Sequence, residues 1–474
     1  MREYGSIIGG EEIFTGKWID VKNPYTGKVV GRVNSLPPAE IEKAMQTTRD
    51  ATMTLSRYER HQILNKMADA IDERVEEISL MITDESGLSL TDTMYEASRV
   101  ADVLRFSAIR TFDDDSQVFP CDISKNGRKR RVYTTRIPLK LIACITPFNH
   151  PMNQVVHKIA PAIATNNTVI LKPSERTPLS SYYLAKLALD CGLPPHMLNV
   201  VNGPVKETCE LLVRSELVSM ISFTGSTEIG KDIANNCGYK KIVIELGGSS
   251  ALIICPDADI DEAVEITMGG LFKNSAQRCT AIRRLIVHES IADEYAAKLT
   301  EKASKLKYGD PYDPNNDMGT VISEESAKLM EDRVNATIAA GAKLLLGNIR
   351  QGAVYSPTVL DYVKNEHAVV CEETFGPVAP IIRYSTLDEA IEIANDTAYG
   401  LSGGVVSNHW PTIQRVINEL ETGTINVNEA PSYRIEWTPF GGIKDSGLGY
   451  KEGVIETMKA YTNVKTYSLP WDTP

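Results

Sequence analysis

Between Leu139 and Gly248 the sequence repeats one pattern, in which a short apolar segment is followed by a segment with helical spacing. The apolar segments are LIACITPF, TVILKPSE, MLNVVNG, SMISFTG and KIVIELGG, and the helical segments include Met152–Ala164 and Ser180–Cys191. Alternation of this kind predicts consecutive βαβ units, and therefore a parallel sheet with right-handed crossovers. Dinucleotides bind such sheets at the carboxyl ends of the strands.

A second series of the same kind begins after Gly248. ALIIC, RRLIVHE, KLLLG, APIIRY and GGVVS are expected to be strands, and Ile260–Phe272, Ala292–Leu306 and Ser326–Ala340 to be helices. TINVNEA, the glycine-rich loop PFGGIKDSGLG, a last helix and the strand-like tail NVKTYSLPW follow. The fold class is therefore α/β, with two α/β domains and a cleft between them as the expected place for a substrate.

Two further regions flank these series. Residues 12–36 are expected to form strands and turns at an edge, and Pro38 to about Arg110 has helical spacing. Asn126-Gly127 predicts a β-hairpin, because it lies between two strand-like runs. The basic run Arg128–Arg131 is interpreted as part of a solvated hairpin arm rather than as a nucleic-acid patch.

Composition excludes several classes of protein. The 474 residues are too many for one ordinary domain, and the net charge of -12 argues against nucleic acids and anionic membranes as partners. We find no signal peptide at the N-terminus and no run of the ~18 apolar residues that a membrane span needs. The eight cysteines show no zinc-ligand spacing, so we expect no metal site, reduced thiols and a cytoplasmic protein.

Cys279 stands in the polar segment KNSAQRCTA, directly after Arg278. A neighbouring guanidinium favours the thiolate over the thiol, and the thiolate is the nucleophilic form. A single cysteine is more often a small buried apolar residue. The hypothesis that Cys279 is a nucleophile therefore depends on the polar residues elsewhere in the chain.

Asn149 and Glu245 are the two residues that fit such a nucleophile. If a thiolate attacks an aldehyde, the oxyanion of the tetrahedral adduct needs donors, which the Asn149 amide and the backbone N–H of Cys279 could supply. Once hydride has left for a nicotinamide, the thioester needs a general base, and Glu245 at the end of a buried strand is expected to have a raised pKa. The alternatives are a turn residue for Asn149 and a helix cap or a lysine partner for Glu245.

Two loops are candidates for binding a dinucleotide. FTGSTEIGK follows a strand and begins a helix, so its N–H groups could face a pyrophosphate, although it lacks the GxGxxG spacing. It resembles a P-loop, but Asp232 occupies the position where Ser or Thr would bind magnesium, which argues against an ATPase. In LKPSE, Lys172 and Glu175 end a strand, and Glu175 could accept a bond from a ribose 2′-OH while repelling a 2′-phosphate. This favours NAD over NADP.

Taken together, TPFNHP, LKPSE, FTGSTEIG, IELGG, QRCT, EETFGPV, NDTAYGLS, GTINVN and PFGGIKDSGLG resemble the aldehyde dehydrogenase superfamily, in the order of that family and over nearly the whole chain. The resemblance implies that Cys279 is the nucleophile, Glu245 the general base and Asn149 the oxyanion donor, with hydrolysis to the free acid. It implies an NAD site formed by Thr146, Pro147, Lys172, Ser174, Glu175, Gly225, Ser226, Gly230, Leu246, Glu373 and Phe375. The sequence departs from many members at Ala276, where they have Gly.

The resemblance also implies a domain plan. Residues 1–120 and 138–246 would form a Rossmann-type NAD-binding domain, with 425–455 packing back on it, and 247–424 a second α/β catalytic domain. Residues 121–137 and 456–474 would form a β-hairpin arm that makes a homodimer or homotetramer.

Within the superfamily, KNSAQRCTA, YGDPYDPNNDMGTVI, TPFGGIKDSGLGYKEGV and the KTYSLPW tail resemble the phosphonoacetaldehyde dehydrogenase group. The substrate implied is phosphonoacetaldehyde, oxidised to phosphonoacetate in 2-aminoethylphosphonate degradation. Arg99, His150 and Arg278 are the cationic groups expected to hold an anionic aldehyde. Their alternatives are a surface helix charge, a helix-start residue and an orienting cation, respectively.

Other functions remain open at this level. Other aldehyde substrates are succinate semialdehyde, sulfolactaldehyde or lactaldehyde, with NAD or NADP as cofactor. A protein that kept the fold but lost catalysis, and a P-loop ATPase, are alternatives of other classes.

Overall fold

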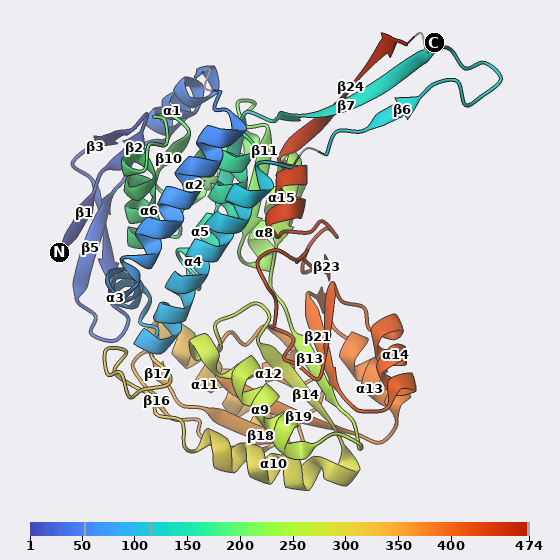
Figure 1. Ribbon diagram of the computed structural model, residues 1–474. Helices are drawn as coiled ribbons and strands as arrows, with labels where there is room; N and C mark the ends of the chain where they lie inside the picture. The colour runs from blue at the N-terminus through green and yellow to red at the C-terminus, as the bar shows by residue number, and fades with distance from the viewer. Residues whose placement is uncertain (52–53, 114, 472–474) are drawn as a thin grey trace.

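The computed structural model describes residues 1–51, 54–113 and 115–471. Each of its two lobes is built on a seven-stranded sheet, and an antiparallel arm extends from the first lobe (Figure 1). The first lobe contains the sheet β12-β11-β8-β9-β10-β2-β3, and the second lobe contains the sheet β15-β18-β19-β14-β13-β21-β22. This is the α/β fold with two parallel sheets that the alternating pattern predicts.

The sheet of the first lobe is parallel over five strands: β8 (Leu141–Ile145), β9 (Thr168–Lys172), β10 (Leu198–Val200), β11 (Met220–Thr224) and β12 (Lys241–Glu245). Between consecutive strands lie α5 (Asn153–Ala164), α6 (Leu179–Asp190), α7 (Val205–Arg214) and α8 (Thr227–Asn236). Every residue of β8, β9 and β11 is buried, which explains their continuous apolar sequences. The short strands β2 (Ser6–Ile8) and β3 (Glu11–Ile13) complete one edge in antiparallel pairing.

The helical region of the N-terminal third forms four separate helices: α1 (Pro38–Asp50), α2 (Arg57–Asp72), α3 (Val75–Ser86) and α4 (Leu90–Arg110). α2 begins with a capping box between Ser56 and Glu59, and α3 ends at Gly87, whose φ of 73° is left-handed. α4 packs against α2, α3 and α5 and reaches the junction between the lobes. The strands β1 (Arg2–Tyr4), β4 (Trp18–Lys22) and β5 (Val29–Asn34) form a separate small sheet.

In the second lobe, the parallel strands are β13 (Ser250–Ile254), β14 (Ile282–His288), β18 (Thr358–Asp361), β19 (Val378–Tyr384), β21 (Ser402–Val406) and β22 (Thr424–Val427). β15 (Lys343–Leu346) pairs antiparallel with β18. The helices are α9 (Ile260–Leu271), α10 (Glu289–Ala303), α11 (Glu324–Ala339), α12 (Ala368–Cys371), α13 (Leu387–Asn395) and α14 (Trp410–Glu419). α10 begins earlier than expected because the His288 side chain caps its first turn.

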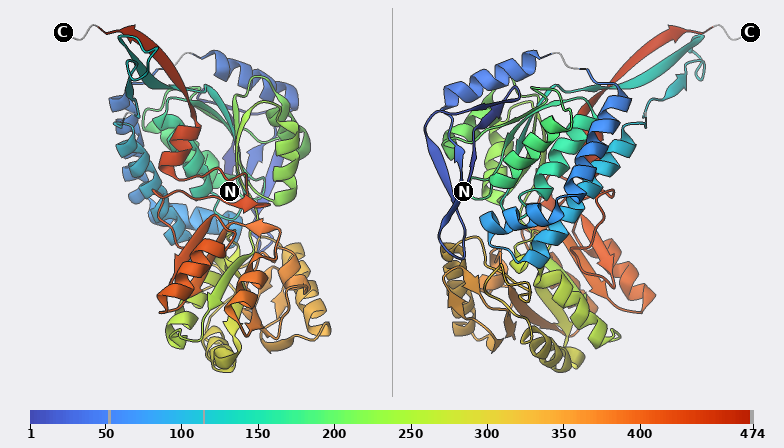
Figure 2. Two further views of the ribbon diagram at one scale, coloured as in Figure 1. Left: turned by 90° about the vertical axis from the view of Figure 1, so that its right-hand side faces the viewer. Right: turned by 60° about the vertical axis from the view of Figure 1, so that its left-hand side comes forward.

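The arm consists of β6 (Val118–Pro120), β7 (Arg130–Pro138) and β24 (Thr462–Pro470), which follows α15 (Val454–Ala460). β6 and β7 are antiparallel, so the structure contains the hairpin, but residues 121–129 form a longer loop rather than a tight turn at Asn126-Gly127. β24 pairs with β7 along its whole length. Figure 2 shows the arm projecting away from both lobes.

The chain returns from the second lobe to the first between Val427 and Val454, through the minor strand β23 (Ile443–Lys444). On this return Gly447 forms a β-bridge with Glu245, and the Leu246 N–H donates to the Ser446 carbonyl at 3.1 Å. The outgoing and returning segments therefore lie against each other. The domain limits expected from the sequence stay a prediction. Within the described ranges, no helix combines the length and the apolar character needed to cross a lipid bilayer.

Candidate active site

One cavity of about 960 Å³ opens at the carboxyl ends of β8, β9, β11 and β12 and reaches the second lobe. It is lined by all three predicted catalytic residues and by every predicted cofactor residue except Gly230. These residues are Thr146, Pro147, Asn149, Lys172, Ser174, Glu175, Gly225, Ser226, Glu245, Leu246, Cys279, Glu373 and Phe375. The sequence segments that carry the resemblance therefore converge on one place in the structure.

Glu245 and Cys279 both line this cavity and lie close enough for each to shift the pKa of the other. The carboxylate ends β12 and is buried. Burial raises the pKa of Glu245 to about 7, and the nearby Glu452 carboxylate adds to this effect. The two groups predicted as base and nucleophile are thus adjacent, and a carboxyl group with this pKa can exchange protons at neutral pH.

The ionisation of Cys279 differs from the sequence-based expectation. Burial and the adjacent Glu245 raise the pKa of the thiol well above its usual value, so the resting group is the thiol. The Arg278 guanidinium donates instead to the carbonyls of Gly269 and Gly270, both at 2.9 Å. Arg278 interacts electrostatically with Cys279, as the sequence-based argument expects, but its charge does not outweigh burial. Among the cations, Arg434 lowers the thiol pKa most, and its effect is also smaller than that of burial.

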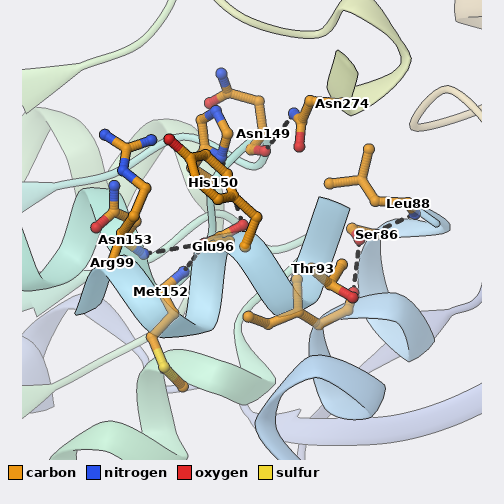
Figure 3. A network of polar contacts seen from close by, with 12 residues as sticks. Ser86, Leu88, Thr93, Glu96, Arg99, Asn149, His150, Met152, Asn153 and Asn274 are labelled. Carbon is orange, nitrogen blue, oxygen red and sulfur yellow. Dashed lines mark hydrogen bonds and ion pairs between the residues drawn. The ribbon is translucent and has the colours of Figure 1, made fainter. Parts of the chain in front are cut away.

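Asn149 lies beside the turn that precedes the nucleophile. Its Nδ2 donates to the Gln277 carbonyl at 2.9 Å, and Asn274 Nδ2 donates to the Asn149 carbonyl at 3.1 Å (Figure 3). Asn149 Nδ2 carries a second hydrogen that this bond does not use. Asn149 and Cys279 both line the cavity. This arrangement can place one amide N–H near an oxyanion on a carbon bound to the sulfur.

The other end of the cavity has the features of a dinucleotide site. Lys172 is buried, and its ammonium lies 3.4 Å from the partly exposed carboxylate of Glu175. α8 begins at the cavity, where Ser226 caps its first turn, so that end of the helix can bind a phosphate. A Cβ at Gly247 would lie 2.6 Å from Glu373 Oε2, so only glycine leaves room for that carboxylate. These residues fit a nicotinamide dinucleotide lying along the cavity.

Gly230 is the one predicted cofactor residue outside the cavity lining. A Cβ at this position would lie 2.1 Å from Cδ2 of Leu246. Gly230 therefore permits the close approach of α8 to the segment after β12, which is a packing role. The motif spacing could not distinguish such a glycine from one that faces a phosphate.

The three predicted substrate residues do not line the cavity, and of the three Arg278 is the one whose charge acts on Cys279. Arg99, on α4, forms an ion pair with Glu436, and His150 Nδ1 lies 3.5 Å from Glu96 Oε2. Glu96 is held in place by the backbone N–H groups of Met152 and Asn153, each at 3.0 Å (Figure 3).

Arg278 is different from the other two candidates, because it forms no ion pair with a carboxylate within the described residues. Its Nε is buried, and among the described atoms it has no hydrogen-bond partner. Asp92 on α4 is close enough to act electrostatically on both Arg278 and His150. The three predicted substrate residues, Arg99, His150 and Arg278, therefore come from three separate chain segments.

Two further groups of this region, Arg434 and Glu436, were not found from the sequence. Arg434 stacks on Phe440 at 4.1 Å and lowers the pKa of both Cys279 and Glu245. Glu436 contacts His157 and Arg99, and these contacts hold its pKa below the usual value although burial acts in the opposite direction. Both lie in a loop, PSYRIEW, that carries no motif, so only the fold shows that they belong here.

A buried ion pair, Lys158–Glu452 at 2.9 Å, lies behind Glu245. Glu452 raises and Lys158 lowers the pKa of the Glu245 carboxyl. Sequence reasoning missed this pair because its members are almost 300 positions apart in the chain.

The family model that matches this chain is that of the aldehyde dehydrogenase family, and it covers residues 13–467. The chain belongs to the aldehyde dehydrogenase family. It is 36% identical over 462 residues to the 3-sulfolactaldehyde dehydrogenase of Priestia megaterium, which spans 97% of both chains. Membership of this family excludes the ATPase alternative. Because the match covers residues 13–467, it applies to nearly the whole chain.

Solved structures agree with this assignment. Aldehyde dehydrogenase 21 from Physcomitrella patens, in complex with the reaction product succinate, superposes with a TM-score of 0.96 at 32% identity, covering 99% of this chain and 98% of that one. Glyceraldehyde-3-phosphate dehydrogenase from Methanocaldococcus jannaschii, complexed with NADP, has a TM-score of 0.92 at 34% identity, covering 96% and 100%. The structure from Methanocaldococcus jannaschii contains NADP, and another similar structure, from Sinorhizobium meliloti, is that of an NAD-dependent aldehyde dehydrogenase.

Proposed function

We propose that this aldehyde dehydrogenase oxidises a small anionic aldehyde, with phosphonoacetaldehyde as the preferred substrate, to the free acid using NAD and water. The observation that carries the proposal is that Cys279 and Glu245 line the same cavity, close enough to interact electrostatically. The product of the preferred reaction would be phosphonoacetate, in 2-aminoethylphosphonate degradation.

The first half of the reaction needs a thiolate, and the resting thiol has a raised pKa. Glu245, with a pKa of about 7, can accept the thiol proton as sulfur attacks the aldehyde carbon. Asn149 Nδ2 and the backbone N–H of Cys279 would then donate to the oxyanion. A nicotinamide dinucleotide, when bound along the cavity, supplies the hydride acceptor. Glu245 must next release this proton to solvent, because only its base form can take a proton from the water that hydrolyses the thioester. The departing thiolate then recovers a proton from Glu245.

The arginines of this region, Arg99, Arg278 and Arg434, favour the proposal that the substrate is anionic. Arg278 has a buried Nε without a partner among the described atoms, directly beside the nucleophile. Such a donor costs free energy until an acceptor reaches it, and a phosphonate oxygen is a strong acceptor. Arg99 and Arg434 share Glu436 with His157, so their charges are partly compensated, and a dianion would complete the balance.

NAD is proposed as the cofactor because of Glu175. Its carboxylate is at the cavity, next to Lys172, where it can accept from a ribose 2′-OH and would repel a 2′-phosphate. We further propose that the arm, with its exposed apolar residues such as Phe119 and Leu469, joins subunits in a homodimer or homotetramer. Cysteines described as free fit a reducing compartment, which favours the cytoplasm.

The test is a set of kcat/KM measurements on phosphonoacetaldehyde, sulfolactaldehyde, succinate semialdehyde, lactaldehyde and propanal, each with NAD and NADP. We expect phosphonoacetaldehyde with NAD to be favoured over propanal by at least about a hundredfold, the value of two charge-assisted hydrogen bonds. A preference for propanal or lactaldehyde would contradict the anionic substrate.

Sulfolactaldehyde is the second candidate, because the relative from Priestia megaterium acts on it and a sulfonate would meet the same arginines. A sulfonate carries one charge less than a phosphonate dianion. The ratio of kcat/KM for sulfolactaldehyde to that for propanal should not change from about pH 6 to about pH 8, because a sulfonate does not titrate in this range. The corresponding ratio for phosphonoacetaldehyde should change, because the phosphonate does titrate there.

A further inference from the structure

The turn that precedes Cys279 has an uncommon backbone. Asn274, Ser275 and Ala276 have φ values of 61°, 49° and 58°, so three consecutive residues other than glycine are left-handed. Glycine adopts this region freely and asparagine tolerates it, but a serine or alanine there is strained. Because such strain persists only where surrounding contacts impose it, the turn needs groups that hold it.

Arg283 is one of the side chains that contact this turn, together with Asp92 and Asn149. It is 2% exposed, and its Nη2 donates to the Ala276 carbonyl at 2.6 Å and to the Arg278 carbonyl at 3.3 Å. The same guanidinium bonds the carbonyls on both sides of Gln277. Nη2 alone donates to both of these carbonyls, and the planar guanidinium leaves Nη1 for a third acceptor, which the single nitrogen of a lysine could not reach with the same geometry.

The other side of the Arg283 guanidinium contacts the loop that carries the proposed cofactor residues. Nη1 donates to the Gly376 carbonyl at 3.0 Å, and the group lies 5.5 Å from the centre of the Phe375 ring. One buried side chain therefore connects the nucleophile turn with the Phe375 loop. Burial of a guanidinium is costly unless its donors are used, so these bonds are part of what keeps Arg283 there.

We propose that Arg283 is a positioning residue, which imposes the left-handed turn Asn274–Ala276 and thereby places the sulfur and backbone N–H of Cys279 beside Glu245. It compensates for alanine at position 276, where glycine would be unstrained. The inference rests on the proposed role of Cys279 as the nucleophile.

The test is a double-mutant cycle with Arg283→Met and Ala276→Gly on the full-length protein. Cys279 alkylation by iodoacetamide is followed without cofactor from about pH 6 to about pH 10 by mass spectrometry of its peptide, and kcat and KM are measured separately. We expect Arg283→Met to release the sulfur from Glu245, so the midpoint of alkylation falls by about one pH unit toward that of an ordinary thiol. The same variant should lose about tenfold or more in kcat, with a smaller change in KM for the aldehyde.

Ala276→Gly should restore much of the midpoint and of kcat in the Arg283→Met protein, and should change both far less in the native background. The proposal would be overturned if Ala276→Gly changed kcat and the midpoint by the same amount in the native protein and in the Arg283→Met protein. Positions that act independently show no such coupling.

Arg284 is the matched control, since it is also 2% exposed and adjacent in sequence but bonds the carbonyls of Ser249, Ile393 and Ala394. Arg284→Met should lower Tm without moving the alkylation midpoint, and an equal shift would show that Arg283 acts only through general stability. If Arg283→Met does not fold, Arg283→Lys replaces it in the same cycle, with a smaller shift expected.

Failure of the proposed function gives a different result. If Cys279→Ala keeps dehydrogenase activity, the nucleophile is wrong, whereas loss of activity in Cys279→Ala with no coupling between positions 276 and 283 would refute only the role of Arg283.

Discussion

The cofactor end and the substrate end of the cavity are built in different ways. The cofactor end consists of short loops at the carboxyl ends of consecutive parallel strands, each with a recognisable sequence such as LKPSE or FTGSTEIG. The substrate end joins α4, the segment after β8, the turn before Cys279 and the loop around Arg434, and these segments are spread over more than 300 positions of the chain. A binding site on regular βα connections can be recognised from sequence, while a site assembled from distant loops needs the fold.

If the two ends meet at one reacting centre, removal of the thiol should have the largest effect. Cys279→Ala is expected to lower kcat by about 10⁴-fold or more, since covalent catalysis is lost, while the Kd for NAD changes by less than about threefold. Stopped-flow absorbance at the reduced nicotinamide band and calorimetric titration measure the two quantities. Cys255→Ala, at a buried cysteine outside the cavity, is the control and should keep its activity.

The next largest effect should come from Glu245→Gln, with a loss in kcat of about 10²–10⁴-fold. In the native protein the base form of Glu245 becomes populated as pH rises through about 7, so kcat should rise over that range and level off above it. The variant should lack this dependence. A native profile that falls through pH 7 would contradict the assignment of Glu245 as the general base.

The substrate end is tested by Arg278→Ala and Arg434→Ala. Each should reduce kcat/KM for phosphonoacetaldehyde by about 10–100-fold, the value of a lost charge-assisted hydrogen bond, and for propanal by much less. Equal losses for both aldehydes would show that these arginines act on the thiol or the turn rather than on an anion. Lys298→Ala, on the outer face of the second lobe, serves as the charge-matched control.

The smallest effect is expected at the cofactor end. Glu175→Gln removes the repulsion of a 2′-phosphate, and we expect the ratio of kcat/KM with NADP to that with NAD to rise about tenfold. Because its side chain is partly exposed, the effect should decrease with added salt. An unchanged ratio would mean that Glu175 does not contact the ribose.

The sequence predicted the strands and helices well where apolar periodicity decided them, as in β8, β9 and α5. The tight hairpin turn that the sequence predicted at Asn126-Gly127 is a longer loop over residues 121–129, since a local signal does not determine loop length. Arg99 was expected near the site and is near it, but its ion pair with Glu436 depends on a residue 337 positions away. Likewise, the ionisation of Cys279 depends mainly on its burial. The presence of Arg278 next to it in the sequence does not show that it is buried.

The lobes are connected at two opposite sides of the molecule. On one side lie the outgoing and returning segments at Glu245 and Gly447, and on the other the Thr320 N–H donates to the Gly87 carbonyl at 2.7 Å and the Leu90 N–H to the Pro311 carbonyl at 3.2 Å. With attachments on both sides, a simple hinge rotation that widens the interior would have to break one of these sets of backbone bonds. We therefore expect substrate and product to pass through the mouth of the cavity, with local movement of short loops rather than a clamshell opening.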